Sequence, residues 1–237
     1  MNNWNNLINQ IKMHDRTNLT PISEFMQYLA KHRDSDTQPL PSLNDLSHEL
    51  GLSVASLREQ LEVARALGLV DVRPRVGIRR LPYTFRPAVH QSLSYALALD
   101  ENKFTKFSEL RNHIETAYWD EAVRLLTEDD QEELRALIHR ARDKLSPPNI
   151  QVPHEEHRSL HLLIYRRLEN PFVTGLLEAY WDAYEEVGLN VFAGSYEYLK
   201  KVWQYHETMV EAICKGDYQA GREALITHID MLYERPE

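Results

Sequence analysis

The sequence predicts a mostly α-helical protein of two parts, a winged helix-turn-helix followed by an all-α antiparallel helical bundle. Within residues 39–81, two short helical patterns are followed at once by two strand patterns with little spare chain. After residue 86 every periodic pattern is helical, and glycine and proline are scarce. Residues 1–86 carry 11 basic and 9 acidic side chains, against 16 and 27 in residues 87–237. We therefore expect only the first part to approach phosphates.

The bulk composition narrows the class of protein. A chain of 237 residues suffices for two domains, which we place at residues 1–82 and 88–237. The single cysteine, Cys214, excludes an internal disulfide framework, and its apolar neighbours indicate an inert core thiol. No apolar run approaches ~20 residues and the first residues lack signal-peptide character, so we expect a cytoplasmic protein with no membrane partner. Residues 1–19 are interpreted as a loosely ordered or dimer-contacting extension.

Helix caps delimit the elements of the first domain. Serine or threonine precedes each helical pattern and glycine follows two of them, as is usual at helix starts and ends. A turn ending at Gly77 joins the two strands. The expected elements are a helix over 21–32 that begins at Thr20 and Pro21, helices from Ser42 to Gly51 and from Ser53 to Gly68, and strands over 69–73 and 78–81.

This order of elements places the helix after Ser53 in the DNA major groove. Its first turns would meet base edges and phosphates, while the arginines of the hairpin would contact the backbone or the minor groove. The alternatives are a purely structural pair of helices and a solvated hairpin face. The expected DNA-binding residues are Ser53, Ser56, Arg58, Gln60, Arg73, Arg75 and Gly77.

This segment resembles the DNA-binding module of the GntR family of bacterial transcription regulators. The matching residues are Leu40-Pro41-Ser42, Ser53, Arg58-Glu59, Leu61, Gly68-Leu69 and Gly77. Val54 replaces the arginine that usually follows the serine of the recognition helix, and Asn44 replaces a polar, often basic residue. The resemblance implies that Arg58 contacts DNA, whereas the two departures leave the operator sequence open.

The sequence pattern of the second domain predicts helix throughout. Prolines at 82 and 87 enclose a short linker, and an Asn-Pro and a Gly-Asp pair separate later helices. The polar faces of an antiparallel bundle account for the many acidic residues. The expected helices cover residues 87–99, 103–126, 128–145, 152–168, 170–188, 194–215 and 217–234.

Four of the eleven histidines lie on stripes expected to face inward. His157 and His161 are four residues apart, so their imidazoles leave one helix face about one turn apart and can meet a single ion. His206 and His228 lie among apolar residues of the last two helices. Neutral imidazoles suit Zn, Ni, Cu or Fe better than Mn or Mg. The alternative is a set of hydrogen-bonded core histidines.

The second domain also resembles the FCD domain, the effector-binding domain of FadR-type GntR regulators. The residues that carry the resemblance are Arg111-Asn112-His113-Ile114-Glu115, His157-Arg158-Ser159-Leu160-His161, Asn170-Pro171, His206 and His228. It implies a metal held by an aspartate and three histidines, with His157 here in the aspartate's place. Four neutral ligands leave a divalent ion its full charge, which favours Zn or Ni and an anionic effector. The alternatives are three histidines plus water, and ligation by His154.

The same resemblance implies that Arg111, Glu115 and Asn170 bind the effector. Arg111 would face the cavity and hold a carboxylate in a bidentate pair. The alternative is a surface ion pair between Arg111 and Glu115 within one helix. Most of the aromatic residues are expected to fill the core rather than line a pocket, namely Tyr180, Trp181, Tyr184, Trp203 and Tyr205.

Together these features predict a homodimeric, metabolite-responsive transcription regulator. A small carboxylate would move the bundle and change the spacing of two DNA-binding modules on a double-stranded operator. Repression relieved by the ligand is the default expectation. One alternative is a metal-dependent enzyme fused to a DNA-binding module, although Glu155 and Glu156 are directed away from the His157 face. Another is a structural metal closed by four protein ligands, with no response to a ligand.

Overall fold

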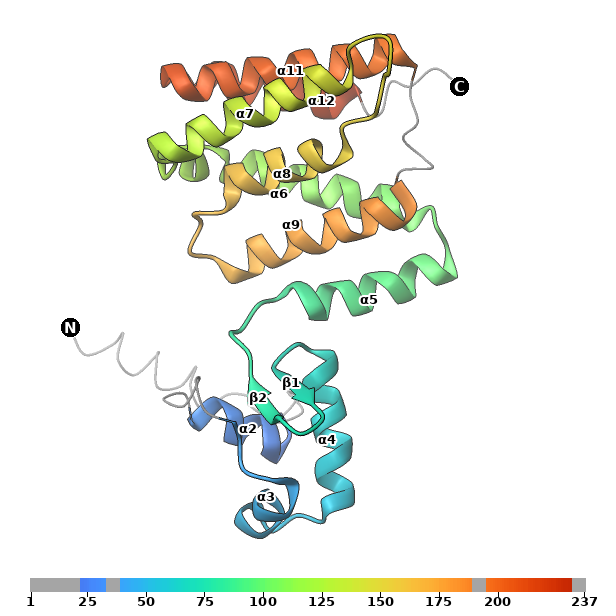
Figure 1. Cartoon of the computed structure of the whole chain (residues 1–237), viewed down its shortest axis with the longest axis vertical. Helices are drawn as coiled ribbons and strands as arrows, with labels where there is room; N and C mark the ends of the chain where they lie inside the picture. The colour runs from blue at the N-terminus through green and yellow to red at the C-terminus, as the bar shows by residue number, and fades with distance from the viewer. Residues whose placement is uncertain (1–21, 33–38, 189–194, 232–237) are drawn as a thin grey trace, which may run out of the picture. The chain divides into compact units, whose positions relative to one another are not determined.

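The structure is a computed structural model that describes residues 22–32, 39–188 and 195–231. The chain divides into two compact units, Met1–Pro82 and Tyr83–Glu237. Both are helical apart from one two-stranded sheet, which confirms the predicted fold class (Figure 1). The extension over residues 1–19 lies outside the described residues, as do Thr20 and Pro21.

In the described part of the first unit, three helices pack on a small hydrophobic core. Its helices are α2 (Glu24–Lys31), α3 (Leu43–Leu50) and α4 (Val54–Ala66). The hydroxyl of Ser23 caps α2, so this helix begins later than the predicted residue 21. Ser42 and Ser53 cap α3 and α4, and Gly51 ends α3 with φ at 67°, as their positions in the sequence predict. The fully buried core residues are Phe25, Leu46, Leu57 and Ala64.

The hairpin that follows is short and antiparallel. Strand β1 (Val70–Arg73) pairs with β2 (Gly77–Arg80) in a register that sets Val70 opposite Arg80. The turn requires left-handed backbone at Arg75 and Gly77, with φ of 65° and 92°. Ile78 faces the core, and its carbonyl accepts a hydrogen bond from the Leu40 amide at 2.7 Å.

The second unit is a bundle of antiparallel helices in layers. Within it, α7, α11 and α12 lie on one side of α6 and α8, and α9 lies between these two and α5 (Figure 1). None of the described helices is both long and apolar enough to cross a membrane. The elements are α5 (Arg86–Leu99), α6 (Lys103–Arg124), α7 (Glu128–Lys144), α8 (His154–Tyr165), α9 (Pro171–Ala183), the π-helical turn η2 (Tyr184–Gly188), α11 (Tyr196–Lys215) and α12 (Tyr218–Met231).

Over the described residues the predicted spans agree with these bounds to within a few residues, with one change of type; residues 194 and 232–234 of the last two predicted helices lie outside the described residues. The helix predicted over 170–188 is α-helical only to Ala183 and continues as a π-helical turn. Close packing holds α12 on α6: a Cβ at Gly221 would lie 2.7 Å from Cζ2 of Trp119, whose indole donates to the Tyr218 carbonyl at 2.9 Å. These contacts fix the helices that carry the candidate site.

Candidate metal centre

Four histidines from three helices converge in the middle of the bundle. His157 and His161 come from α8, His206 from α11 and His228 from α12. One ring nitrogen from each lies within 4.8 Å of the others. Three of the side chains are fully buried, and His157 is partly exposed. The four-residue spacing on α8 directs its two rings to one face, and the antiparallel pair α11 and α12 supplies the others.

Burial keeps all four imidazoles neutral. It lowers the pKa of each ring well below the usual histidine value, and neighbouring histidines and Arg111 lower the pKa of most of them further. Nδ1 of His206, Nε2 of His157 and both nitrogens of His228 have no hydrogen-bond partner among the described residues. Buried polar atoms are rarely left so. The donor set therefore fits a divalent ion that prefers nitrogen ligands, and does not fit a hydrogen-bonded histidine core.

His161 connects this cluster to α6. Its Nε2 lies 3.2 Å from Nε2 of His206, while its Nδ1 lies 2.8 Å from Nη2 of Arg111 and 3.2 Å from Oε2 of Glu115. The guanidinium can only donate, so a proton on Nε2 satisfies Arg111. A proton on Nδ1 instead faces Glu115 and leaves the Nε2 lone pair for an ion.

Arg111 and Glu115 form an ion pair, Nε to Oε1 at 2.9 Å, with both side chains buried. The pair is thus not at the surface. The guanidinium also lies over the rings of Tyr180 and Trp181, at 4.9 and 5.2 Å from their centroids. Burial raises the pKa of Glu115 to about 7, although Arg111 acts in the opposite direction. Arg111 is therefore engaged by protein groups and orients His161.

Asn170 lies away from the cluster. Its side-chain oxygen caps α9 by accepting from the amides of Phe172 and Val173 at 3.1 and 3.3 Å. It precedes Trp181, which packs on the cluster, by eleven residues. That separation is about 16 Å along a helix. The geometry assigns Asn170 to helix capping, and the expected contact with an effector has no support in it.

A cavity of about 30 Å³ opens on the cluster. His157 and His228 border it, and the remaining walls come from the start of α8, from η2 and from α11. His154 lies at this cavity but outside the group of four, so the sequence alternative that made it a ligand is not favoured. The space accommodates one water-sized group.

Aromatic rings enclose the histidines. Tyr180, Trp181, Tyr184 and Trp203 are buried core residues, as the sequence predicts, and some of them also pack on the cluster. The ring centroids of Trp181 and His157 are 4.7 Å apart, as are those of Trp203 and His206. The three-residue spacing of Trp203 and His206 was a usable signal, because it sets them on one helix face. Trp181 lies on α9, which carries none of the four histidines, so no spacing in the sequence indicates its contact with them.

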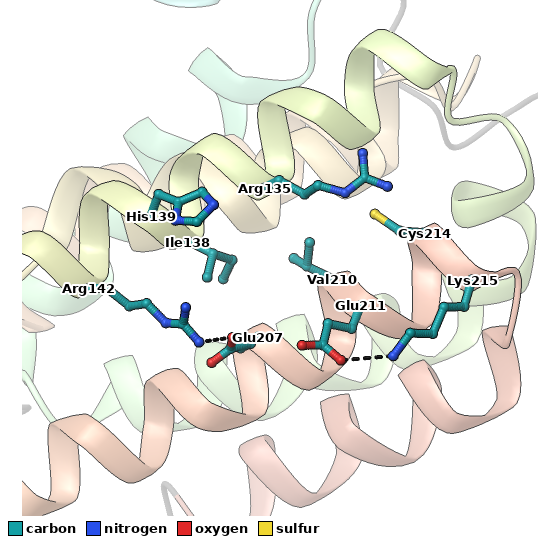
Figure 2. A pocket seen from close by; sticks show the side chains of 9 residues that line it. All are labelled: Arg135, Ile138, His139, Arg142, Glu207, Val210, Glu211, Cys214 and Lys215. Atoms are coloured by element: carbon teal, nitrogen blue, oxygen red, sulfur yellow. Dashed lines mark hydrogen bonds and ion pairs between the residues drawn. The ribbon is translucent and has the colours of Figure 1, made fainter.

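A second cavity, of about 400 Å³, lies between α7 and α11 and is separate from the cluster (Figure 2). The ion pair of Arg142 with Glu207 bridges α7 and α11 at its rim, and that of Lys215 with Glu211 lies along α11. Cys214 lies in its wall, partly exposed rather than in the core, and burial raises the pKa of its thiol. A raised pKa agrees with an inert cysteine.

The candidate DNA-binding side chains are distributed over α4 and the hairpin. Arg58 and Arg75 are exposed, and Arg73 is exposed while paired with Asp71 at 2.6 Å. Ser53 caps α4 by accepting from the amide of Ser56 at 3.1 Å.

Gln60 is engaged within the first unit. Its side-chain oxygen accepts from the Phe25 amide at 2.9 Å, and its nitrogen donates to Glu24 at 3.3 Å. These bonds tie α4 to α2, so Arg58 is better placed than Gln60 to contact DNA.

Comparison with known proteins then identifies the family. Residues 106–231 match the FCD domain, which is more than half of the chain. The chain belongs to the FCD domain family of GntR-type regulators. This FCD-domain protein is therefore a transcription regulator, and the metal-dependent enzyme is set aside. No curated protein sequence matches the chain.

The chain is similar to several solved structures, of which the first supports the fold. A GntR protein of Streptococcus agalactiae is similar with a TM-score of 0.61 and 15% identity over 87% of this chain and 94% of that one. McbR/YncC of E. coli gives a TM-score of 0.48 and 18% identity over 83% and 89%. A structure of Lar, described as controlling the expression of the Listeria monocytogenes agr system, gives a TM-score of 0.47 and 17% identity over 88% and 92%.

Proposed function

We propose that this FCD-domain regulator holds a divalent transition metal, Zn or Ni, at His157, His161, His206 and His228, and senses a small carboxylate there. The observation that carries the proposal is the set of four neutral, largely unpartnered imidazoles within 4.8 Å of one another. Leaving such atoms buried and unpaired is costly, and an ion satisfies them together.

Residues outside the cluster prepare it for the ion. With an ion on Nε2 of His161, the ring proton resides on Nδ1, where Glu115 accepts it and the hydrogen bond from Nη2 of Arg111 is given up. Arg111 in turn holds Glu115. When bound, the metal supplies a positive charge that attracts an anionic ligand.

A sensing site is favoured over a closed structural site by the cavity of about 30 Å³ beside His157 and His228. Structural zinc sites have four protein ligands and no room for another. Here the space admits a ligand atom next to the cluster. Ligation by three histidines plus water would use the same space.

The first unit would bind a double-stranded DNA operator. Arg58 on α4 and Arg75 in the hairpin turn are exposed cations that would contact it, together with Ser53, Ser56, Arg73 and Gly77 of the same elements. We expect a homodimer in the cytoplasm, since two half-sites about one helical turn apart match a two-fold symmetric protein. The expected output is repression relieved by ligand.

Metal content tests the proposal. The full chain is stripped with a chelator, reloaded with Zn, Ni, Mn or Mg, and analysed by mass spectrometry. About one Zn or Ni per chain is expected, and little Mn or Mg. His228→Ala should lower zinc affinity at least tenfold, whereas His139→Ala, an exposed histidine of α7, should not change it. A wild-type chain that takes up neither Zn nor Ni would overturn the proposal.

A further inference from the structure

The cavity between α7 and α11 is large enough for a small organic ligand. Its volume of about 400 Å³ lies within the usual range of ligand pockets, about 300 to 1,000 Å³. Its floor is hydrocarbon, because Ile138 of α7 and Val210 of α11 are 6% and 3% exposed. A neighbouring cavity of about 350 Å³ shares Ile138 with it and continues the groove along the same two helices. The described residues that line the two cavities include none of the four clustered histidines, so the groove is a separate space.

The charges in the wall of the larger cavity leave one cation without a partner. Three arginine or lysine side chains and two glutamates line it. The glutamates are paired, Glu207 with Arg142 and Glu211 with Lys215. The guanidinium of Arg135 is exposed and makes no hydrogen bond or ion pair with any described residue. Because the wall carries one positive charge in excess, the cavity favours a ligand with a single negative charge.

Arg135 lies beside carbon and sulfur. Figure 2 shows its side chain at the end of the cavity where α11 presents the sulfur of Cys214, and the positive charge of Arg135 acts on the pKa of that thiol. Ile138 follows Arg135 by three residues on α7, and Val210 precedes Cys214 by four on α11, so each pair shares one helix face. An anion held by Arg135 therefore brings the rest of its molecule onto this apolar floor.

We propose that this cavity is a small-molecule site, distinct from the histidine cluster, that takes an organic monocarboxylate with an apolar body of about naphthalene size. The carboxylate binds the guanidinium of Arg135, which can offer it two parallel hydrogen bonds. The body covers Ile138, Val210 and Cys214 and removes their surface from water, which stabilises the complex. Metal is not required, because the clustered histidines are not among the described residues of the wall.

Cys214 reports whether the cavity is filled, because it lies in the wall and is the single cysteine of the chain. The full chain is treated with the uncharged thiol reagent N-ethylmaleimide in the presence of 1-naphthoate, and mass spectrometry follows the rate of modification. The reaction is run at mildly alkaline pH, since burial raises the pKa of the thiol. At ten times its Kd, 1-naphthoate should slow the modification about tenfold, in zinc-loaded and in metal-free chain alike.

Matched ligands separate the charge from the hydrocarbon. 1-Naphthamide has the same rings without the charge and should bind about fivefold more weakly than 1-naphthoate, as expected for one exposed ion pair. Acetate has the carboxylate without the rings and should give no protection. Absence of protection by 1-naphthoate, or protection that requires zinc, would overturn the site. Equal affinity for 1-naphthamide would overturn the anionic class, and equal protection by acetate would overturn the apolar body.

A pair of variants tests the position of the carboxylate. Arg135→Gln should lower the affinity for 1-naphthoate about fivefold and leave that for 1-naphthamide unchanged. Arg140→Gln is the control, because Arg140 is an exposed arginine of the same helix that lines neither cavity. Equal affinity of the two variants for 1-naphthoate would contradict the role of Arg135. If Arg135→Gln does not fold, the comparison of 1-naphthoate with 1-naphthamide in the wild-type chain decides alone.

Discussion

Replacing Glu115 tests whether the orientation of the His161 ring affects metal affinity, because the replacement leaves all four metal ligands in the chain. Glu115 is not a member of the cluster, yet among the described residues it is the carboxylate that pairs with His161, Oε2 to Nδ1 at 3.2 Å. Glu115→Gln keeps the shape and weakens the acceptor for the Nδ1 proton. Loss of such an outer partner typically lowers metal affinity by 10- to 100-fold, and about tenfold is expected here.

Competition against a chromophoric zinc chelator measures this change. Glu109→Gln on the same helix is the control, because Glu109 pairs with the exposed Lys106 at 2.9 Å and should not affect zinc. Equal affinities for the two variants would show that His161 does not need Glu115.

Asp130 illustrates a buried charge with a structural role. It caps α7 through Thr127 and is paired with Arg166 and Arg167, the latter bonding Oδ1 at 3.2 Å. Asp130→Asn should lower the free energy of unfolding by about 2 to 3 kcal/mol. This loss is somewhat smaller than the loss expected for breaking an ion pair in which both partners are buried. Its exposed neighbour provides the control Asp129→Asn, for which less than about 0.5 kcal/mol is expected.

The pH dependence of this contribution has a definite sign. The hydrogen bond from Arg167 holds the pKa of Asp130 well below its usual range. The stabilisation is therefore complete above the unfolded pKa of about 3.9 and declines as the pH falls toward the folded pKa. Urea unfolding should show the difference between wild type and Asp130→Asn shrinking below about pH 4; a constant difference would exclude the charge as its cause.

At the scale of elements, local chemistry made most of the fold predictable. The caps Ser42 and Ser53 and the left-handed Gly51 act within one turn of chain, so their sequence positions sufficed. The pair His157 and His161 was predictable for the same reason. The π-helical turn after Ala183 and the bonds from Gln60 to α2 depend on contacts with other helices, which no spacing reveals.

The same distinction between local patterns and contacts with other helices decides which parts of the site were predictable. Periodicity and resemblance indicated the four histidines, because each lies on the inward face of its own helix. The placement of Arg111 on the far side of His161 was not predictable, since it is decided by Glu115, Tyr180 and Trp181 together. Nor was the capping role of Asn170 apparent, because Asn-Pro fits both a cap and a ligand contact.

Helix α9 connects the cluster to the residues that begin the second unit. Trp181 packs on His157, and the next residue, Asp182, bonds Arg86 at 2.6 Å and Arg158 at 3.0 Å. A Cβ at Gly175 would lie 2.6 Å from the Arg86 amide nitrogen, so helix and chain are in close contact there. A displacement of α8 or α9 is thus expected to move Arg86.

Asp182→Asn should therefore reduce the coupling between metal and DNA. Zinc affinity should change less than twofold, while the zinc-dependent change in affinity for a duplex selected from a random pool should fall at least threefold, measured by fluorescence anisotropy. Glu178→Gln, one turn earlier on α9, is the control. Wild-type coupling in Asp182→Asn would show that this ion pair does not transmit the signal.

At the scale of the whole molecule, metal binding should stabilise one unit selectively. The four ligands belong to Tyr83–Glu237, and three of the four tryptophans, Trp119, Trp181 and Trp203, lie in that unit. Free zinc at a hundred times its Kd adds about 2.7 kcal/mol to the folded state. For a domain of this size, that corresponds to a rise in Tm of roughly 5 to 10 °C.

Thermal melts followed by tryptophan fluorescence will therefore report chiefly on the unit that binds zinc. The expected result is a rise in this transition with Zn and no comparable rise with Mg, because neutral imidazoles bind Mg poorly. Any separate transition of Met1–Pro82, followed by a label on that unit, should stay within about 1 °C, since none of its described residues joins the cluster. Equal shifts of both transitions, or equal effects of Zn and Mg, would mean that the ion acts through general surface charge and not through the four histidines.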